Sequence, residues 1–354
     1  MLPVLTVLSS DQYPAEHQLW AMRILAACAH TADILAQLAS SDAADVLLDF
    51  ASRESLQGTE AQKLALNTLV LLSRDDIGTT LILARGLPLL HALVSMPQVL
   101  GSSQQLLAVE MLAWMTSKGL QQRLTLMCSG IPAALIALIA REELAGHPLM
   151  GPALVTLNNL SAEEESRLEL IEAGILQVLA NVIVFECPGT DWQGTALGIV
   201  CSFAELDEPR VHEAFVTSGV IESISCLLVH YTTDLTASCM PNAKDLRLSA
   251  LQVSVNLSAA PAGTARAMVQ QGVVEALMTV AGNEQENRHP NTSSEQHQLY
   301  AIKALKNLSS EPSCAPLLQK KGAQQLLENL EKDIPDVMAN LDGAIGALAA
   351  LSVS

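Results

Sequence analysis

A nine-residue pattern recurs along almost the whole chain and constrains the fold more than any other feature of the sequence. The segment ALVTLNNLS (153–161) has counterparts that all begin with alanine, at positions 21, 65, 108, 153, 196, 250, 301 and 344. Successive copies are 44, 43, 45, 43, 54, 51 and 43 residues apart. A period of about 20 to 50 residues is typical of repeat proteins, in which each unit buries its apolar face against the next.

Each copy of the pattern has the character of an amphipathic helix. Its second position is aliphatic or methionine, its eighth is apolar, and its ninth is Ala, Ser or Thr. Positions 1, 2, 5 and 8 fall on one face at the helical period. We expect this face to pack between repeats, with the alanine at position 1 allowing a neighbouring helix to approach closely.

A glycine separates two shorter helical segments between successive copies. Each glycine precedes an apolar run such as GIPAALIAL, and they lie at positions 86, 130, 174, 219, 272 and 322. Glycine suits a left-handed turn between two helices. Ser73 with Asp76, and Ser161 with Glu164, have the spacing of a capping box, which predicts the start of the first short helix of a repeat. Pro261 fits an early helical position.

A repeat of three helices and 42–45 residues, with a glycine turn and a third helix of the form A-L-x-x-L-x-N-L-S, resembles the armadillo repeat. HEAT repeats are the neighbouring alternative, but they usually have two helices and lack this combination of glycine and asparagine. The resemblance implies an all-α fold, a right-handed superhelical α-solenoid formed by a single armadillo-repeat domain over residues 1–354. A partial first repeat (1–29) would precede seven repeats that end near residues 73, 116, 161, 204, 258, 309 and 354.

The composition excludes several other classes of protein. Aromatic residues make up 3% of the chain and the apolar runs do not alternate, which argues against an all-β fold. The formal net charge is −18, so nucleic acid and anionic membranes are poor partners. The longest apolar runs span about ten residues, half of what crosses a bilayer, and we expect no membrane insertion.

The cysteines and the N-terminus indicate a cytoplasmic protein. The chain has seven cysteines, at positions 28, 128, 187, 201, 226, 239 and 314. None forms a CxxC pair, and several lie inside apolar helical runs. We interpret them as reduced thiols in the core. The N-terminal MLPVLTVLSSDQYP has no basic region before its apolar stretch, so it does not have the pattern of a signal peptide.

The sequence has no motif for enzyme chemistry. It contains no GxxxxGK[ST] phosphate loop, no GxGxxG after a strand, no HExxH and no GxSxG. The eight histidines are dispersed; His289 and His297 share one segment but lack further ligands at zinc spacing. We therefore expect no enzyme activity, no catalytic residues, no cofactor and no metal site.

Two segments and the two ends depart from the regular repeat. Polar, turn-rich inserts at 231–246 and 283–298 precede the third helix of their repeats, and we expect loops that either bind a partner or have no binding role. Terminal repeats of solenoids usually have a polar outer face, whereas both ends here are apolar. We expect either that the chain is a segment of a longer protein or that a terminal helix contacts a partner or the chain itself.

The armadillo resemblance also implies where a partner would bind. In family members such as importin-alpha and beta-catenin, third helices line the concave wall of the superhelix, and an asparagine near the end of each helix binds the backbone of an extended peptide. This asparagine falls at position 7 of the pattern, and position 3 lies one turn earlier on the same face. The predicted partner-binding residues from these two positions are Arg23, Asn67, Glu110, Trp114, Asn159, Ser202, Gln252, Asn256, Lys303 and Asn307.

The chain departs from importin-alpha-like arrays in two ways. Position 7 is asparagine in only three of the eight copies, and no tryptophan occupies position 3. A classical nuclear-import receptor is therefore not expected. Trp114, at position 7, either presents a large amphipathic surface of the kind found at binding hot spots or fills a local gap.

These features predict a non-enzymatic scaffold that binds a partner protein through its concave third-helix surface. The expected partners are proteins that present extended or basic segments. Two alternatives stay open: the armadillo region of a TPR-containing co-chaperone or of a myosin or axonemal-dynein assembly factor, and a regulatory armadillo domain of a larger enzyme. TPR repeats before residue 1 would favour the first alternative, and a catalytic domain there would favour the second.

Overall fold

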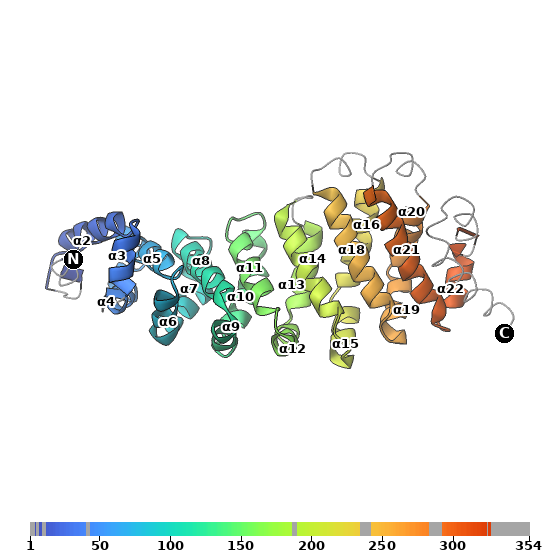
Figure 1. Ribbon diagram of the computed structural model, residues 1–354, viewed down its shortest axis with the longest axis horizontal. Helices are drawn as coiled ribbons and strands as arrows, with labels where there is room; N and C mark the ends of the chain where they lie inside the picture. Colours follow the sequence, from blue (N-terminus) through green and yellow to red (C-terminus); the bar gives the residue numbers. More distant parts are fainter. Residues whose placement is uncertain are drawn as a thin grey trace. The chain divides into compact units, whose positions relative to one another are not determined.

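The computed structural model describes residues 4, 7–8, 12–39, 43–185, 190–233, 242–282, 292–323 and 325–326. These residues form α-helices, short 3-10 helices and turns, and no strand occurs among them (Figure 1). The expectation of an all-α fold is therefore confirmed. By its internal contacts the chain forms two compact units, an N-terminal unit of residues 1–166 and a C-terminal unit of residues 167–354.

The N-terminal unit has three helices per repeat. Its long third helices are α2 (Ala15–Cys28), α5 (Glu60–Leu72), α8 (Ser103–Lys118) and α11 (Met150–Leu160). The shorter first and second helices are α3 (Ala32–Ala39) with α4 (Ala43–Ala51), α6 (Asp76–Arg85) with α7 (Leu87–Ser95), and α9 (Leu120–Met127) with α10 (Ile131–Ile139). The 3-10 helices η1 (Glu54–Leu56), η2 (Pro97–Val99) and η3 (Glu142–Leu144) lead from second to third helices.

The same order continues through the C-terminal unit. Its third helices are α14 (Asp191–Ala204), α18 (Ala243–Ser258) and α21 (Thr292–Ser310). Its shorter helices are α12 (Glu164–Glu172), which crosses the unit boundary, α13 (Ile175–Phe185), α15 (Pro209–Thr217), α16 (Val220–Thr233), α19 (Ala262–Gln270), α20 (Val273–Ala281) and α22 (Ala315–Lys320). The eighth copy of the pattern, 344–352, lies outside the described residues.

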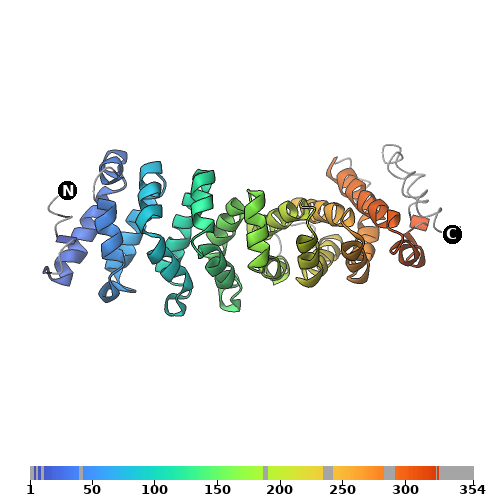
Figure 2. The same cartoon turned by 90° about the horizontal axis from the view of Figure 1, so that it is seen from below.

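Consecutive third helices pack against each other within each unit. In the N-terminal unit α2 contacts α5, α5 contacts α8 and α8 contacts α11; in the C-terminal unit α18 contacts both α14 and α21 (Figure 2). The alanines at position 1 are all buried at these contacts, at positions 21, 65, 108, 153, 196, 250 and 301. Positions 2 and 5 are buried as well, which confirms the predicted packing face. Position 8 is buried except at Cys28, and Ser254 at position 5 satisfies its buried hydroxyl by donating to the carbonyl of Ala250.

The glycine turns follow the expectation with one exception. The glycines at 130, 174, 219, 272 and 322 have φ between 75° and 85°, in the left-handed region. Gly86 instead has φ −87°, so the predicted left-handed turn is wrong at this position. A Cβ on Gly86 would lie 2.9 Å from Leu48 Cδ2 and 2.8 Å from the carbonyl oxygen of Ile82, so space rather than φ favours glycine here.

The serines at position 9 end third helices and do not begin first helices. Ser73 and Ser161 follow α5 and α11, and their hydroxyls donate to the carbonyls of Val70 (2.7 Å) and Asn158 (2.8 Å). The N-cap of α6 is Asp75, and α12 begins only at Glu164, so the predicted capping boxes are wrong. The turn between third and first helices is so short that position 9 still belongs to the preceding helix. Pro261 is likewise the residue before α19 and not an internal residue of that helix.

Buried glutamines near the start of the third helices form a series that the sequence pattern did not predict, and those at 62, 105, 193 and 298 donate to main-chain carbonyls of the second helix of the same repeat. Each lies three residues before a motif alanine, and the series comprises Gln18, Gln62, Gln105, Gln193 and Gln298. The side-chain amide of Gln62 donates to the carbonyl of Ala51 at the end of α4 (2.9 Å) and accepts the N–H of Gly58 (2.9 Å). A buried amide with both functions satisfied fixes the loop between the two helices.

The two polar inserts are helical at their described ends. Helix α16 extends to Thr233, α18 begins at Ala243 and α21 begins at Thr292. The expectation of loops is therefore wrong for residues 231–233, 243–246 and 292–298. Asn242 is a turn residue before α18, and the remaining insert residues, 234–241 and 283–291, lie outside the described residues.

The cysteines are less buried than the sequence suggested. Cys28, Cys128 and Cys226 are exposed, Cys201 is half-buried and Cys314 is buried, and all five are free thiols. The core interpretation is therefore wrong for the three exposed cysteines; Cys28 is the last residue of α2 and Cys128 directly follows α9, so both lie at helix ends. Cysteines 187 and 239 lie outside the described residues.

These differences predict the order of thiol alkylation. Burial raises the pKa of the Cys201 thiol, and the carboxylate of Glu205 raises it further; burial also raises the pKa of Cys314. Since the thiolate is the nucleophile, both thiols should react with iodoacetamide at pH 8 more slowly than the exposed cysteines, and faster as the pH rises. Mass spectrometry of partially alkylated protein gives the order, and Cys201 reacting before Cys28 and Cys226 would contradict it.

Candidate partner-binding surface

Positions 3 and 7 of the pattern stay accessible in every described third helix. All residues at these positions are exposed or half-buried, whereas positions 1 and 2 of the same helices are buried. We call positions 3 and 7 of α2, α5, α8 and α11 the N-terminal ladder surface; it carries Arg23, Asn67, Glu110, Trp114 and Asn159. Positions 3 and 7 of α14, α18 and α21 form the C-terminal ladder surface, which carries Ser202, Gln252, Asn256, Lys303 and Asn307.

Arg23 is engaged within the N-terminal ladder surface. Its guanidinium binds the carboxylate of Glu60 on the next third helix, with Nη2 2.9 Å from Oε1 and 3.0 Å from Oε2. It also lies over the exposed ring of Trp20, 5.1 Å from the ring centroid. Both partners of the ion pair are exposed, so the pair adds at most about 1 kcal/mol to stability and can open for a ligand.

Trp114 is accessible at the middle of the same surface. The residue is 42% exposed, so a large part of the indole is accessible to a ligand. The guanidinium of Arg74 stacks 4.9 Å from the centroid of the indole ring. Lys118 stabilises this arrangement because its ammonium donates to the carbonyl of Arg74 and lies 3.3 Å from a carboxylate oxygen of Asp76.

Glu110 places a negative charge near Trp114. It lies one turn before Trp114 on α8 and is half-buried. Within the part of the chain that the structure describes, its carboxylate makes no ion pair. The apolar side chains of Leu71 on α5 and Val155 on α11 occupy ladder positions of the two adjacent third helices. The surface therefore combines an acid, an aromatic ring and aliphatic groups.

The three asparagines at position 7 each bind the preceding repeat. The amide of Asn159 donates to Thr116 Oγ1 (3.1 Å), and that of Asn307 donates to Ser258 Oγ (3.1 Å) and the carbonyl of Val255 (3.3 Å). Asn256 has only Cys201 Sγ, at 3.9 Å. The side-chain oxygens of Asn159, Asn256 and Asn307 accept no hydrogen bond from any residue in the described ranges.

The other residues of the C-terminal ladder surface are less constrained. Gln252 and Lys303 are exposed at position 3 of α18 and α21. Ser202, at position 7 of α14, donates its hydroxyl to the carbonyl of Ile199 (2.8 Å), and its own carbonyl accepts from Arg167 Nη1 (2.9 Å). The hydroxyl hydrogen of Ser202 is therefore used within its own helix while its oxygen can still accept, and Gln252 and Lys303 are exposed to a ligand.

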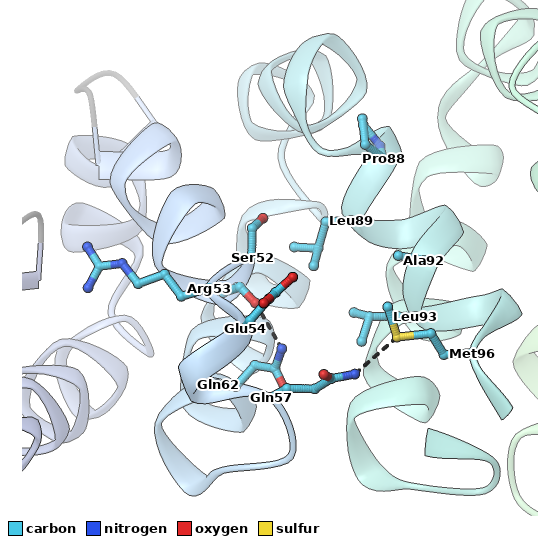
Figure 3. A pocket seen from close by; sticks show the side chains of 11 residues that line it. Ser52, Arg53, Glu54, Gln57, Gln62, Pro88, Leu89, Ala92, Leu93 and Met96 are labelled. Carbon is cyan, nitrogen blue, oxygen red and sulfur yellow. Dashed lines mark hydrogen bonds between the residues drawn. The ribbon is translucent and has the colours of Figure 1, made fainter. Parts of the chain in front are cut away.

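Two hollows lie near second helices, away from the ladder positions. One of 250 Å³ lies between η1 and α7, where Glu54 and Leu89 line it and Gln57 reaches across to Met96 Sδ (Figure 3). The other, of 150 Å³, lies beside Gln193 between α13 and α16. Each hollow is lined by one of the buried glutamines, Gln62 or Gln193. The recurring spacing Q-x-x-A, with the motif alanine last, is the sequence signal that could have located the two hollows.

The described residues hold no arrangement typical of metal binding. Over these ranges, no group of three or more His, Cys, Asp or Glu side chains lies close enough to bind a metal ion. His297 is buried and its Nδ1 lies 2.9 Å from Arg247 Nη2, while residue 289 is outside the described part. The same residues include no single helix that is long and apolar enough to cross a membrane. Three pairs of consecutive helices, each pair bent at a short break, reach the required length and apolar composition together.

Comparison with known proteins places the fold. No family model and no curated protein matches the chain. An engineered protein of known crystal structure matches with a TM-score of 0.68 at 20% identity, covering 98% of this chain and 77% of its own. A designed armadillo repeat protein matches with a TM-score of 0.53 at 19% identity, and another, in complex with the peptide (KR)4, with 0.54 at 18%; each comparison covers 74% of this chain and 99% of the other. The chain therefore has an armadillo-like repeat fold, an all-α solenoid.

Proposed function

We propose that this chain is a non-enzymatic scaffold that binds an extended segment of a partner protein across its third helices. The observation that carries this proposal is the accessibility of positions 3 and 7 in every described third helix. Trp114 is exposed, and the three half-buried asparagines have side-chain oxygens that accept no hydrogen bond from the residues that the structure describes. An unused amide oxygen and N–H match the N–H and carbonyl of an extended main chain.

The residues beside Trp114 favour a partner segment with one apolar and one basic side chain. The indole offers a large apolar surface, and Glu110 one turn away offers a charge for a lysine or arginine. The designed armadillo repeat protein that was solved in complex with the peptide (KR)4 supports a basic segment as the ligand. The chain's net charge of −18 would also increase the association rate of a basic segment.

Removing Trp114 and the ladder amides tests the proposal. A peptide-display library is selected against the wild-type chain, and the dissociation constants of the selected peptides are then measured for single variants. We expect Trp114→Ala to weaken binding by about ten- to a hundredfold, as for truncation of an aromatic hot spot. Asn159→Ala should weaken it by about three- to tenfold, because one main-chain hydrogen bond is lost.

Leu120→Ala provides the matched control. Leu120 is 50% exposed on α9, a first helix, and not at a ladder position. This variant should bind every selected peptide as the wild type does. If the triple variant Trp114→Ala, Asn159→Ala, Asn256→Ala kept wild-type affinity for all of them, the third-helix face would not be the binding site.

A further inference from the structure

The ladder asparagines are held by specific groups of the preceding repeat. Asn159 lies 43 residues after Thr116, and Asn307 lies 49 residues after Ser258; both acceptors occupy position 9 of the preceding copy. The hydrogen bond therefore joins two stacked third helices, α8 with α11 and α18 with α21. Among the described residues, the hydroxyls that accept from these two amides both lie at position 9.

The acceptor hydroxyls are themselves fixed. Thr116 is fully buried, and its hydroxyl donates to the carbonyls of Leu112 (2.9 Å) and Ala113 (3.1 Å). Ser258 is buried, and its hydroxyl donates to the carbonyl of Val255 at 2.8 Å. Since a hydroxyl has one hydrogen and two lone pairs, donation to the helix leaves its lone pairs to accept from the asparagine. The direction of the asparagine amide is thus set from outside its own helix.

Asn256 shows what happens where the hydroxyl is missing. The preceding copy has Ala204 at position 9, which has no hydrogen-bonding side chain. The Asn256 amide is left with Cys201 Sγ at 3.9 Å, and a thiol sulfur is a weak acceptor. At position 7 of the pattern, the amides of Asn159 and Asn307 are therefore held by a hydroxyl, whereas the amide of Asn256 has only a weak thiol acceptor among the described residues.

We infer that Thr116 and Ser258 are positioning residues that orient the amides of Asn159 and Asn307 for the main chain of a bound segment. This inference rests on the proposed function. In Asn159 one amide hydrogen is used inside the protein, while Oδ1 and the second hydrogen stay available for a peptide unit. In Asn307 the amide nitrogen already has two acceptors, so Oδ1 is the group left for a peptide unit. Orienting the side chain before binding removes part of the conformational entropy that a free asparagine would lose on binding.

The first test needs no ligand. In the NMR spectrum of the full chain, one Nδ2 proton of Asn159 should exchange slowly with water and be shifted downfield. Thr116→Val, which keeps the shape and removes the hydroxyl, should abolish both signs, and Thr116→Ser should restore them. An Asn159 amide signal that is the same in Thr116→Val and wild type would overturn the inference, regardless of the affinities measured for the selected peptides.

The second test measures coupling in binding with a peptide selected by display on the wild-type chain. Thr116→Val should weaken binding by about three- to tenfold, and this loss should disappear in the Asn159→Ala background. An equal loss in both backgrounds would mean a structural role and overturn the inference. Insensitivity of binding to Asn159→Ala itself would also overturn the inference, whereas the proposed function is overturned only if the triple variant Trp114→Ala, Asn159→Ala, Asn256→Ala keeps wild-type affinity.

A gain-of-function variant keeps the inference testable if Thr116→Val folds poorly. Ala204 is half-buried at position 9, so Ala204→Ser adds the missing hydroxyl beside Asn256 without touching a ladder residue. We expect the Asn256 amide to show the slow exchange that Asn159 shows in the wild type. An unchanged Asn256 signal in a folded Ala204→Ser variant would also count against the positioning role.

Discussion

Replacing Gln105 with alanine is expected to lower the free energy of unfolding of the N-terminal unit by about 3 kcal/mol. Gln105 is fully buried, and its amide donates to the carbonyls of Leu93 (3.1 Å) and Val94 (3.2 Å) near the end of α7. Its Oε1 accepts the N–H of Gly101 at 2.9 Å. Alanine removes the partner of these main-chain groups and leaves a cavity, and each unsatisfied buried group costs about 1–3 kcal/mol.

Two variants separate the causes of this loss. Gln105→Met keeps most of the volume but no amide, so it should retain the part of the destabilisation that comes from hydrogen bonding. Gln98→Ala changes an exposed glutamine of η2 and should shift stability by less than about 0.5 kcal/mol. Urea unfolding followed by circular dichroism, with amide hydrogen exchange of α7 and α8, gives the comparison. A Gln105→Ala protein as stable as Gln98→Ala would show that the buried amide does not hold the loop.

Gly78→Ala is expected to destabilise the same unit by about 3 kcal/mol. A Cβ on Gly78 would lie less than 3.0 Å from the carbonyl carbon and oxygen of Leu72, which are main-chain atoms at the end of α5. The contact cannot be relieved by a rotamer change, and the Thr79 hydroxyl, which donates to the carbonyl of Ser73 at 2.8 Å, opposes movement of α6 away from α5.

Two control substitutions accompany Gly78→Ala, one with almost no expected effect and one that is expected to stabilise the protein. Ile77→Ala alters the adjacent, 56% exposed residue and should change stability by less than about 0.5 kcal/mol. Gly198→Ala lies in the interior of α14, where an added Cβ meets nothing within 4 Å, and should stabilise the protein by about 0.5–1 kcal/mol. Thermal unfolding followed by circular dichroism measures all three; a Gly78→Ala melting temperature at or above that of Ile77→Ala would contradict the close approach of α6 to α5.

The repeat and its packing face could be read from the sequence because helix packing depends on residue size and polarity at a fixed period. An alanine at position 1 with aliphatics at positions 2 and 5 describes a buried face wherever it occurs, and the structure buries all of these positions in the described helices. The same periodicity placed Trp114 and Asn159 on the opposite, accessible face. These predictions need no information beyond the local order of residues.

Hydrogen-bonding roles were harder to predict because they depend on which helix a residue belongs to. Ser161 has the spacing of an N-cap, yet it ends α11, and only the observed length of that helix decides between the two roles. Gln105 looks like a surface residue by polarity, but its neighbours bury it and satisfy both ends of its amide. The recurrence of glutamine three residues before the motif alanine carried this information, although hydropathy did not.

The sequence by itself determined that this protein stacks three-helix repeats and which side of each third helix stays accessible. Only the tertiary structure decided how the accessible side chains are held, because their partners lie on other repeats. Thr116 and Asn159 are 43 residues apart, and the repeat spacing alone does not place one hydroxyl 3.1 Å from one amide. That distance follows from how α8 and α11 stack, which is set by the packing of many small and apolar residues at once.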